Sequence, residues 1–125
     1  MVGRRVLLVD SQANMTFALE LLFAQHGFKR RVSRTGEQAL AMRQEVPPDC
    51  VVLATELPFR SGFEVCEILR PRPGSSHAMM IMFPSTGTEA ECVTAASFGA
   101  DARLFWPILT AELIRTAHTL LELPA

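Results

Sequence analysis

The order in which strand-like and helix-like segments follow one another is the feature that most constrains the fold of this chain. Continuous apolar runs at 6–9, 50–54 and 79–83 are typical of strands that are covered on both faces. A more polar segment at 28–33 and a short one at 103–105 complete the predicted set of five strands. Each strand is followed by residues with a different periodicity, so the chain is expected to alternate between strand and helix.

Apolar residues at helical spacing fill the intervals between these strands. The predicted helices cover residues 13–26, 36–45, 63–69, 89–98 and 110–121. Strands separated by helices form parallel sheets with right-handed crossovers and helices on both faces. The sequence therefore predicts an α/β fold: a flavodoxin-like three-layer sandwich with a five-stranded parallel sheet of order 2-1-3-4-5 and five helices.

The composition fits one domain covering residues 1–125. The chain is 49% hydrophobic and 20% charged, which is typical of a compact globular protein. No apolar run approaches the roughly 20 residues that span a bilayer, and no signal peptide is recognisable, so a cytoplasmic protein without membrane contact is expected. The three cysteines, Cys50, Cys66 and Cys92, have no paired spacing and are expected to be free thiols, mostly buried.

Basic residues are concentrated in the first third of the chain. Residues 1–43 hold seven basic and three acidic side chains, and the cluster includes Lys29, Arg30, Arg31 and Arg34. Nucleic-acid binding is one interpretation, but no aromatic residue other than Phe28 lies among these cations. Edge strands carry Lys and Arg to block pairing with other chains, so the cluster more simply predicts an edge position for strand 28–33.

The predicted strand order places a cleft at the carboxyl ends of the first and third strands, where Asp10 and Ala54 lie. Around them stand Leu7-Leu8-Val9-Asp10, the stretch from Pro48 to Cys66, Gly99-Ala100-Asp101, and Pro107. With these motifs the chain resembles a response-regulator receiver domain (CheY-like), over almost its whole length. The resemblance implies two-component, phosphorelay signal transduction.

The resemblance also implies a set of chemical positions, most of which this sequence has lost. In receivers, two adjacent acids hold Mg²⁺, an aspartate accepts the phosphoryl group, and a hydroxyl and a lysine contact the phosphoryl oxygens. Asp10 matches the first acid. The remaining positions are occupied by Ser11 at the second acid, Ala54 at the acceptor, Pro84 at the hydroxyl with Ser85 next to it, and Trp106 at the lysine.

These departures predict a pseudo-receiver without phosphoryl chemistry at its usual site. Alanine has no nucleophilic oxygen, and one carboxylate is a poor site for Mg²⁺, which gives up its waters reluctantly. Asp10 is therefore at most a weak metal candidate, and it is expected to cap the loop or the helix after the first strand. Glu56 is an alternative ligand or acceptor, although a solvated loop side chain is the simpler interpretation. We expect no cofactor and no enzymatic activity, since no nucleophile–base pair is visible.

Without phosphoryl chemistry, the function is expected to depend on a surface that binds other proteins. The segment 89–121 corresponds to the face that receivers use for dimers and partners, and its exposed candidates are Glu91, Arg103, Glu112 and Arg115. We expect contact with a signalling protein or a second copy, with no nucleic acid bound by this domain. Two alternatives remain: an indirect response to phosphorylation through a competent partner, or a small-anion-binding module that uses the cleft. The chain ends soon after the last helix, either as a stand-alone domain or as part of a longer protein.

Overall fold

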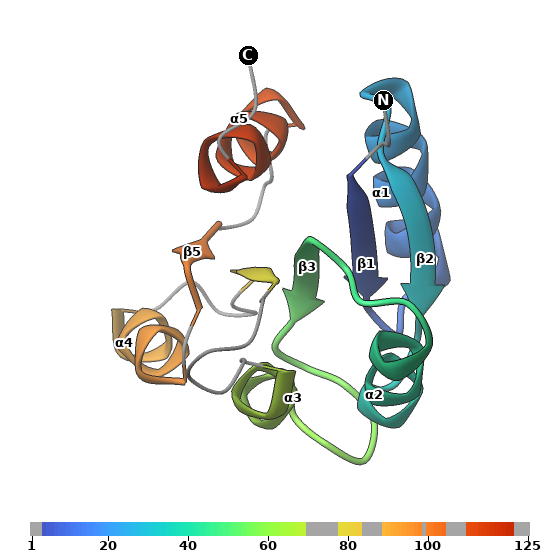
Figure 1. Cartoon of the computed structure of the whole chain (residues 1–125). Helices are drawn as coiled ribbons and strands as arrows, with labels where there is room; N and C mark the ends of the chain where they lie inside the picture. Colours follow the sequence, from blue (N-terminus) through green and yellow to red (C-terminus); the bar gives the residue numbers. More distant parts are fainter. Residues whose placement is uncertain (1–3, 70–77, 84–88, 99, 105–109, 122–125) are drawn as a thin grey trace.

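The computed structural model describes residues 4–69, 78–83, 89–98, 100–104 and 110–121. Its strands are β1 (Arg5–Val9), β2 (Lys29–Ser33), β3 (Cys50–Ala54), β4 (Met79–Phe83) and β5 (Ala102–Arg103). They form one parallel sheet in the order β2-β1-β3-β4-β5 (Figure 1). The predicted flavodoxin-like fold and its strand order are confirmed.

The helices alternate with the strands as the periodicity predicts. They are α1 (Ala13–Gln25), α2 (Gly36–Glu45), α3 (Gly62–Leu69), α4 (Glu89–Ser97) and α5 (Thr110–Leu120). Gly27 ends α1 with a φ of 79°, the left-handed conformation that favours glycine. The differences from prediction are small: β2 begins after Phe28, and β5 begins one residue earlier than predicted and does not include Leu104. Phe105, the predicted last residue of this strand, lies outside the described residues.

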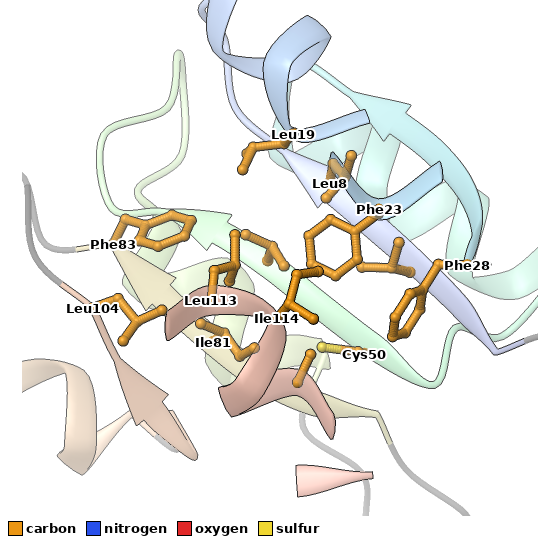
Figure 2. Packing of buried hydrophobic residues seen from close by; sticks show 13 residues of the cluster. Leu8, Leu19, Phe23, Phe28, Cys50, Ile81, Phe83, Leu104, Leu113 and Ile114 are labelled. Atoms are coloured by element: carbon orange, nitrogen blue, oxygen red, sulfur yellow. The ribbon is translucent and has the colours of Figure 1, made fainter. Parts of the chain in front are cut away.

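Alternate residues of each buried strand supply two separate cores, one on each face of the sheet. Val6 and Leu8 of β1 face α1 and α5, and this cluster includes Phe23 and Leu113 (Figure 2). Leu7 of β1 faces α2 and α3 instead. The second cluster joins strand residues to residues of these two helices, and its other members are Val9, Ala39, Val51, Leu53, Val65, Cys66, Leu69, Ala78, Met80 and Met82. Because a strand's side chains alternate between faces, both faces of β1, β3 and β4 are apolar, which explains their continuous hydrophobic runs.

The polar strand β2 lies at the edge of the sheet, as its basic residues predict. Only Ser33 is buried in it, whereas Lys29 and Arg30 are exposed. Cys50 and Cys66 are buried, as predicted, and the side chain of Cys92 lies outside the description. Burial, with a smaller contribution from Asp101 and Asp49, raises the pKa of the Cys50 thiol to about 12, so this thiol stays protonated.

Two aspartates at the amino ends of the strands fix neighbouring strands together. The Asp49 carboxylate accepts the Arg5 N–H at 2.8 Å, and the Asp49 N–H donates to the Arg5 carbonyl at 2.9 Å. Asp101 repeats the arrangement with Met80, at 2.7 and 2.8 Å. Hydrogen bonds to ionised carboxylates are the stronger kind, so each aspartate anchors the start of its strand.

Candidate functional site at the carboxyl ends of the strands

The register of the sheet brings together the three residues that end its central strands. Val9 of β1 pairs with Leu53 of β3, so Asp10 and Ala54 occupy equivalent positions on adjacent strands. Ala54 in turn pairs with Phe83, the last residue of β4. The predicted neighbourhood of Asp10 and Ala54 is therefore confirmed. The side chains at these three positions, Asp10, Ala54 and Phe83, are a carboxylate, a methyl group and an aromatic ring.

Asp10 is buried, with 8% of its surface exposed, and it organises the turn after β1. Its Oδ1 accepts the Gln12 N–H at 3.0 Å, and its own N–H donates to the Ser33 carbonyl of β2 at 3.1 Å. The pKa of this carboxyl is raised above its usual 3.8 because burial disfavours the charged form, and the N–H groups of Gln12 and Ser11 offset part of that effect. The predicted loop-capping role of Asp10 is confirmed, although the residue preceding α1 is Gln12, which makes no side-chain cap.

We expect Asp10→Asn to raise the melting temperature at pH 7. Asparagine keeps an Oδ1 that accepts the Gln12 N–H, and it removes the cost of burying a charge. That cost is fully present above the folded-state pKa. It shrinks as pH falls through the folded-state pKa and is gone below the unfolded value of 3.8, where both states are protonated. The gain should therefore shrink as pH is lowered, and thermal unfolding of both proteins from roughly pH 8 to pH 4 measures it. A gain that does not change with pH would rule out ionisation of Asp10 as its cause.

The β3–α3 loop passes so close to the end of β3 that one position there tolerates only glycine. The Gly62 N–H donates to the Thr55 carbonyl at 2.8 Å. A Cβ atom at Gly62 would collide with the Ala54 carbonyl oxygen and would lie 2.7 Å from the Thr55 Cα. The first residue of α3 therefore lies directly against the backbone that follows Ala54, which is why the loop turns back over the strand end.

The same loop holds Phe59 in a strained conformation and exposes its ring. Phe59 has a φ of 70°, which is rare for a bulky residue, and the Arg60 N–H donates to the Pro58 carbonyl at 2.8 Å across it. Its side chain is 98% exposed. Next to it, Arg60 Nε and Glu37 Oε1 are 2.7 Å apart, and this ion pair ties the loop to α2. Phe59 was not among the site residues predicted from the sequence. The pattern that could have indicated it is an aromatic residue in a proline-containing turn.

Phe59→Gly is expected to stabilise the protein by about 1 kcal/mol despite removing an aromatic side chain. Relief of a left-handed non-glycine residue contributes about 1–2 kcal/mol, and the greater freedom of glycine in the unfolded chain offsets about half of it. No burial is lost, because the ring is exposed. Phe59→Ala is the matched control: it removes the ring and keeps the strain, so its unfolding free energy should stay near that of the unchanged protein. Chemical denaturation measures both, and destabilisation by Phe59→Gly would contradict the expectation.

The other predicted residues of the cleft are solvated or lie outside the description. Ser11 and Glu56 are exposed, as expected for loop side chains, and Ala54 is half-buried. Pro84, Ser85 and Trp106 fall among the residues that the structure does not describe. Within the described ranges, no group of three or more His, Cys, Asp or Glu residues could hold a metal ion.

The predicted interaction surface is exposed where it is described. Arg103 lies on β5, and Glu112 and Arg115 lie on α5, all with exposed side chains (Figure 1). Glu91 is in α4, but its side chain is outside the description. His26 and His118, which appear scattered in the sequence, lie with their ring centroids 6.4 Å apart at the α1–α5 contact.

Comparisons with known proteins agree with this geometry. The family model for the response regulator receiver domain matches residues 6–118. The phosphate regulon transcriptional regulatory protein PhoB of Rhizobium meliloti is 30% identical over 118 residues, covering 94% of this chain and 52% of that protein. The DNA-binding response regulator MtrA of Mycobacterium tuberculosis is 31% identical over 111 residues, covering 89% of this chain and 47% of that protein. The chain thus spans about half the length of these curated relatives.

Solved structures share the fold at lower sequence identity. A putative response regulator from Chloroflexus aurantiacus superposes with a TM-score of 0.90 at 24% identity, covering 97% of this chain and 99% of that one. The chemotaxis response regulator CheY4 of Vibrio cholerae gives 0.86 at 19% identity, covering 95% and 99%. Among the described residues, none of the helices is both long and apolar enough to cross a membrane.

Proposed function

Because this chain belongs to the response regulator receiver family, we propose that it is a two-component signalling module that acts without phosphorylation at its own strand end. The observation that carries the proposal is Ala54 at the last position of β3, beside the equivalent position of Asp10 on β1. A methyl group offers no oxygen to a phosphoryl donor. The neighbouring hydroxyl of Ser11 is exposed and adds no negative charge that would hold Mg²⁺.

The remaining carboxylates do not replace the missing pair. Asp10 already accepts the Gln12 N–H, and burial is the largest cause of its raised pKa. Glu56 is exposed, two residues beyond Ala54, so solvent competes for its charge. With one buried acid and one solvated acid, the strand ends lack the clustered oxygens of a Mg²⁺-dependent phosphoryl-transfer site. The domain then acts through its surfaces, as a pseudo-receiver that contacts a signalling protein or a second copy of itself.

Two features of the surface support a role in protein contact. Glu112 and Arg115 lie three residues apart on α5 and carry opposite charges, which suits a self-complementary contact about a two-fold axis. Phe59 exposes a whole aromatic ring at the cost of backbone strain, and such strain is typically retained at functional sites. The charged face is the principal candidate because Arg103 of β5 adds a third exposed charge within the segment 89–121.

The proposal that the strand end is not phosphorylated is tested by incubating the protein with Mg²⁺ and acetyl phosphate, and separately with a beryllofluoride mimic. Mass spectrometry should detect no acyl-phosphate adduct, and NMR amide shifts around Asp10 and Ala54 should stay small. A receiver that has an aspartate at the acceptor position serves as the positive control under the same conditions. A stable adduct, or large shifts around Asp10, would show that the strand end still performs phosphoryl chemistry.

The proposal that the domain acts through protein contacts is tested by charge reversal on α5. We expect Glu112→Arg or Arg115→Glu alone to weaken self-association or partner binding, and the double reversal to restore part of it, because both charges are exchanged. Glu67→Arg on α3 is the matched control, since Glu67 is also an exposed helical carboxylate. Sedimentation equilibrium measures self-association. If the control and the α5 variants behave alike, the α5 face is not the contact surface.

A further inference from the structure

A second concave site lies near the amino ends of β1 and β2, away from Asp10 and Ala54. It is a pocket of about 220 Å³ lined by Arg5, Val6, Leu7, Lys29, Arg30, Arg31, Met42, Val46 and Pro48. Its lining combines four cationic residues with five apolar ones. Neither the strand-end chemistry nor the α5 surface uses any of these residues, so the pocket calls for a separate explanation.

The sheet register explains why the cations gather on one side of the pocket. Leu7 packs in the cluster on the α2 face, and Arg5 is two residues earlier on the same strand, so it projects to the same face. Arg5 pairs with Lys29, and Leu7 pairs with Arg31, which places Lys29 and Arg31 on that face as well. Arg30 alternates to the other face, where its Nη1 donates to the Phe28 carbonyl at 3.1 Å.

The apolar lining comes from the end of α2 and the segment that follows it. Met42 packs against the α2-face cluster beside Leu7. The helix ends at Glu45, and Val46 and Pro48 continue the wall as the chain leads into β3. Val46 is a large apolar residue left 37% exposed there. The result is an apolar wall opposite a row of cations, which suits a ligand with one apolar part and one charged end.

The charges around the pocket are only partly neutralised. Glu45 pairs with Arg31 at 3.1 Å, and Asp49 lies 3.9 Å from Arg4. Within the described part of the chain, the Arg5 and Lys29 side chains make no hydrogen bond or ion pair. Two cations thus remain available beside an apolar cavity. Protection of an edge strand explains why exposed cations occur on β2, but it does not explain a pocket beside them.

We propose that this pocket binds a small organic anion whose apolar body contacts Met42, Val46 and Pro48 and whose charged group meets Arg5 and Lys29. A cavity of about 220 Å³ lies just below the range of roughly 300–1,000 Å³ that is usual for small-molecule sites. A small ligand such as a single aromatic ring carrying a carboxylate or a phosphate suits a site of that size. The mouth is lined by charged side chains and open to solvent, so binding is weak and depends on ionic strength.

Benzoate, phenyl phosphate and benzamide distinguish the contributions of charge and shape. We expect benzoate or phenyl phosphate to bind with a dissociation constant on the order of 1 mM, and the neutral isostere benzamide to bind at least about tenfold more weakly. The stronger of the two anions identifies the charged group that the site prefers. NMR titration should move the amides of 5–7, 29–31 and 42–48, and leave those of 10–11 and 54–56 unchanged. Equal binding of benzamide, or shifts centred on 10–11 and 54–56, would overturn the proposal.

Lys29→Gln is the variant of choice, because Lys29 is exposed and its loss leaves no buried group unpaired. It should weaken binding of the anion about threefold to fivefold, as expected for one exposed charge pair, and Arg5→Gln combined with it should weaken binding further. Arg34→Gln is the matched control: Arg34 is exposed just beyond β2 and does not line the pocket. Thermal unfolding verifies that the variants are folded. Equal weakening by Arg34→Gln, or displacement of benzoate by a short DNA duplex, would reveal a general basic surface in place of a pocket.

Discussion

Gly62→Ala is expected to destabilise this protein by roughly 3 kcal/mol and to lower its melting temperature by roughly 10 °C. The added Cβ would collide with the Ala54 carbonyl oxygen and would lie 2.7 Å from the Thr55 Cα, and both are backbone atoms that cannot rotate away. Either the hydrogen bond from Gly62 to Thr55 breaks, or the end of β3 shifts. Overpacking of this kind costs about 1–3 kcal/mol, with the upper end where rigid groups collide. Denaturant titration with circular dichroism measures the loss.

Gly27→Ala is the informative control because it tests a different reason for glycine. Gly27 has a φ of 79°, but a Cβ there would have no atom within 4 Å. Only conformational strain opposes the alanine, so its cost should be about 1 kcal/mol, clearly below that of Gly62→Ala. Equal losses at the two positions would mean that the close approach of α3 to the end of β3 does not limit the choice of residue.

Ala54→Asp is expected to make the stability of the protein depend on Mg²⁺. The new carboxylate would stand beside Asp10 on the adjacent strand, and two like charges in a partly buried site repel each other. Without the metal, the variant should be less stable than the unchanged protein at pH 7. With Mg²⁺ at ten times its dissociation constant, binding to the folded state should return about 1.4 kcal/mol. Melting temperatures with and without 10 mM MgCl₂ measure the effect, and the unchanged protein should show none.

A double variant separates the contributions of the two acids. Ala54→Asp combined with Asp10→Asn keeps the new carboxylate and removes its neighbour, so both the repulsion and the Mg²⁺ dependence should largely disappear. If the unchanged protein is itself stabilised by Mg²⁺ to the extent expected of Ala54→Asp, then Asp10 and its surroundings hold the metal without a second acid. The inference that these strand ends lack a Mg²⁺ site would then be wrong, although Ala54 would still offer no oxygen to a phosphoryl donor.

Much of the architecture could be predicted because each central strand is apolar on both faces. Val6, Leu7 and Leu8 belong to two different cores, and such a run has few explanations other than a parallel strand between helix layers. The short β5 is the exception. It holds two residues, and Leu104 is buried beyond its end, so a buried apolar residue near a strand was mistaken for part of it.

The residues of the candidate site could be located from the sequence because strand ends in a parallel sheet share one edge. Asp10 follows the apolar run of β1, and Ala54 ends the apolar run of β3. The register of the two strands makes these residues neighbours. The sequence also identified Ala54 as the residue that cannot accept a phosphoryl group, since that statement depends on side-chain chemistry alone. Phe59 could not be predicted as a strained residue, because its φ of 70° is a property of the folded loop and no periodic sequence pattern indicates it.

The sequence by itself determined the layered fold, the edge position of β2 and the chemistry missing at Ala54, because apolar periodicity and side-chain identity are local properties. Only the tertiary structure decided which residues meet across long stretches of chain. The approach of Gly62 to the end of β3 and the pairing of Arg5 with Lys29 beside Met42 depend on strand register and helix placement. From the sequence alone, the basic residues predict only an exposed edge strand. In the fold, Arg5 and Lys29 line a pocket whose other wall is apolar.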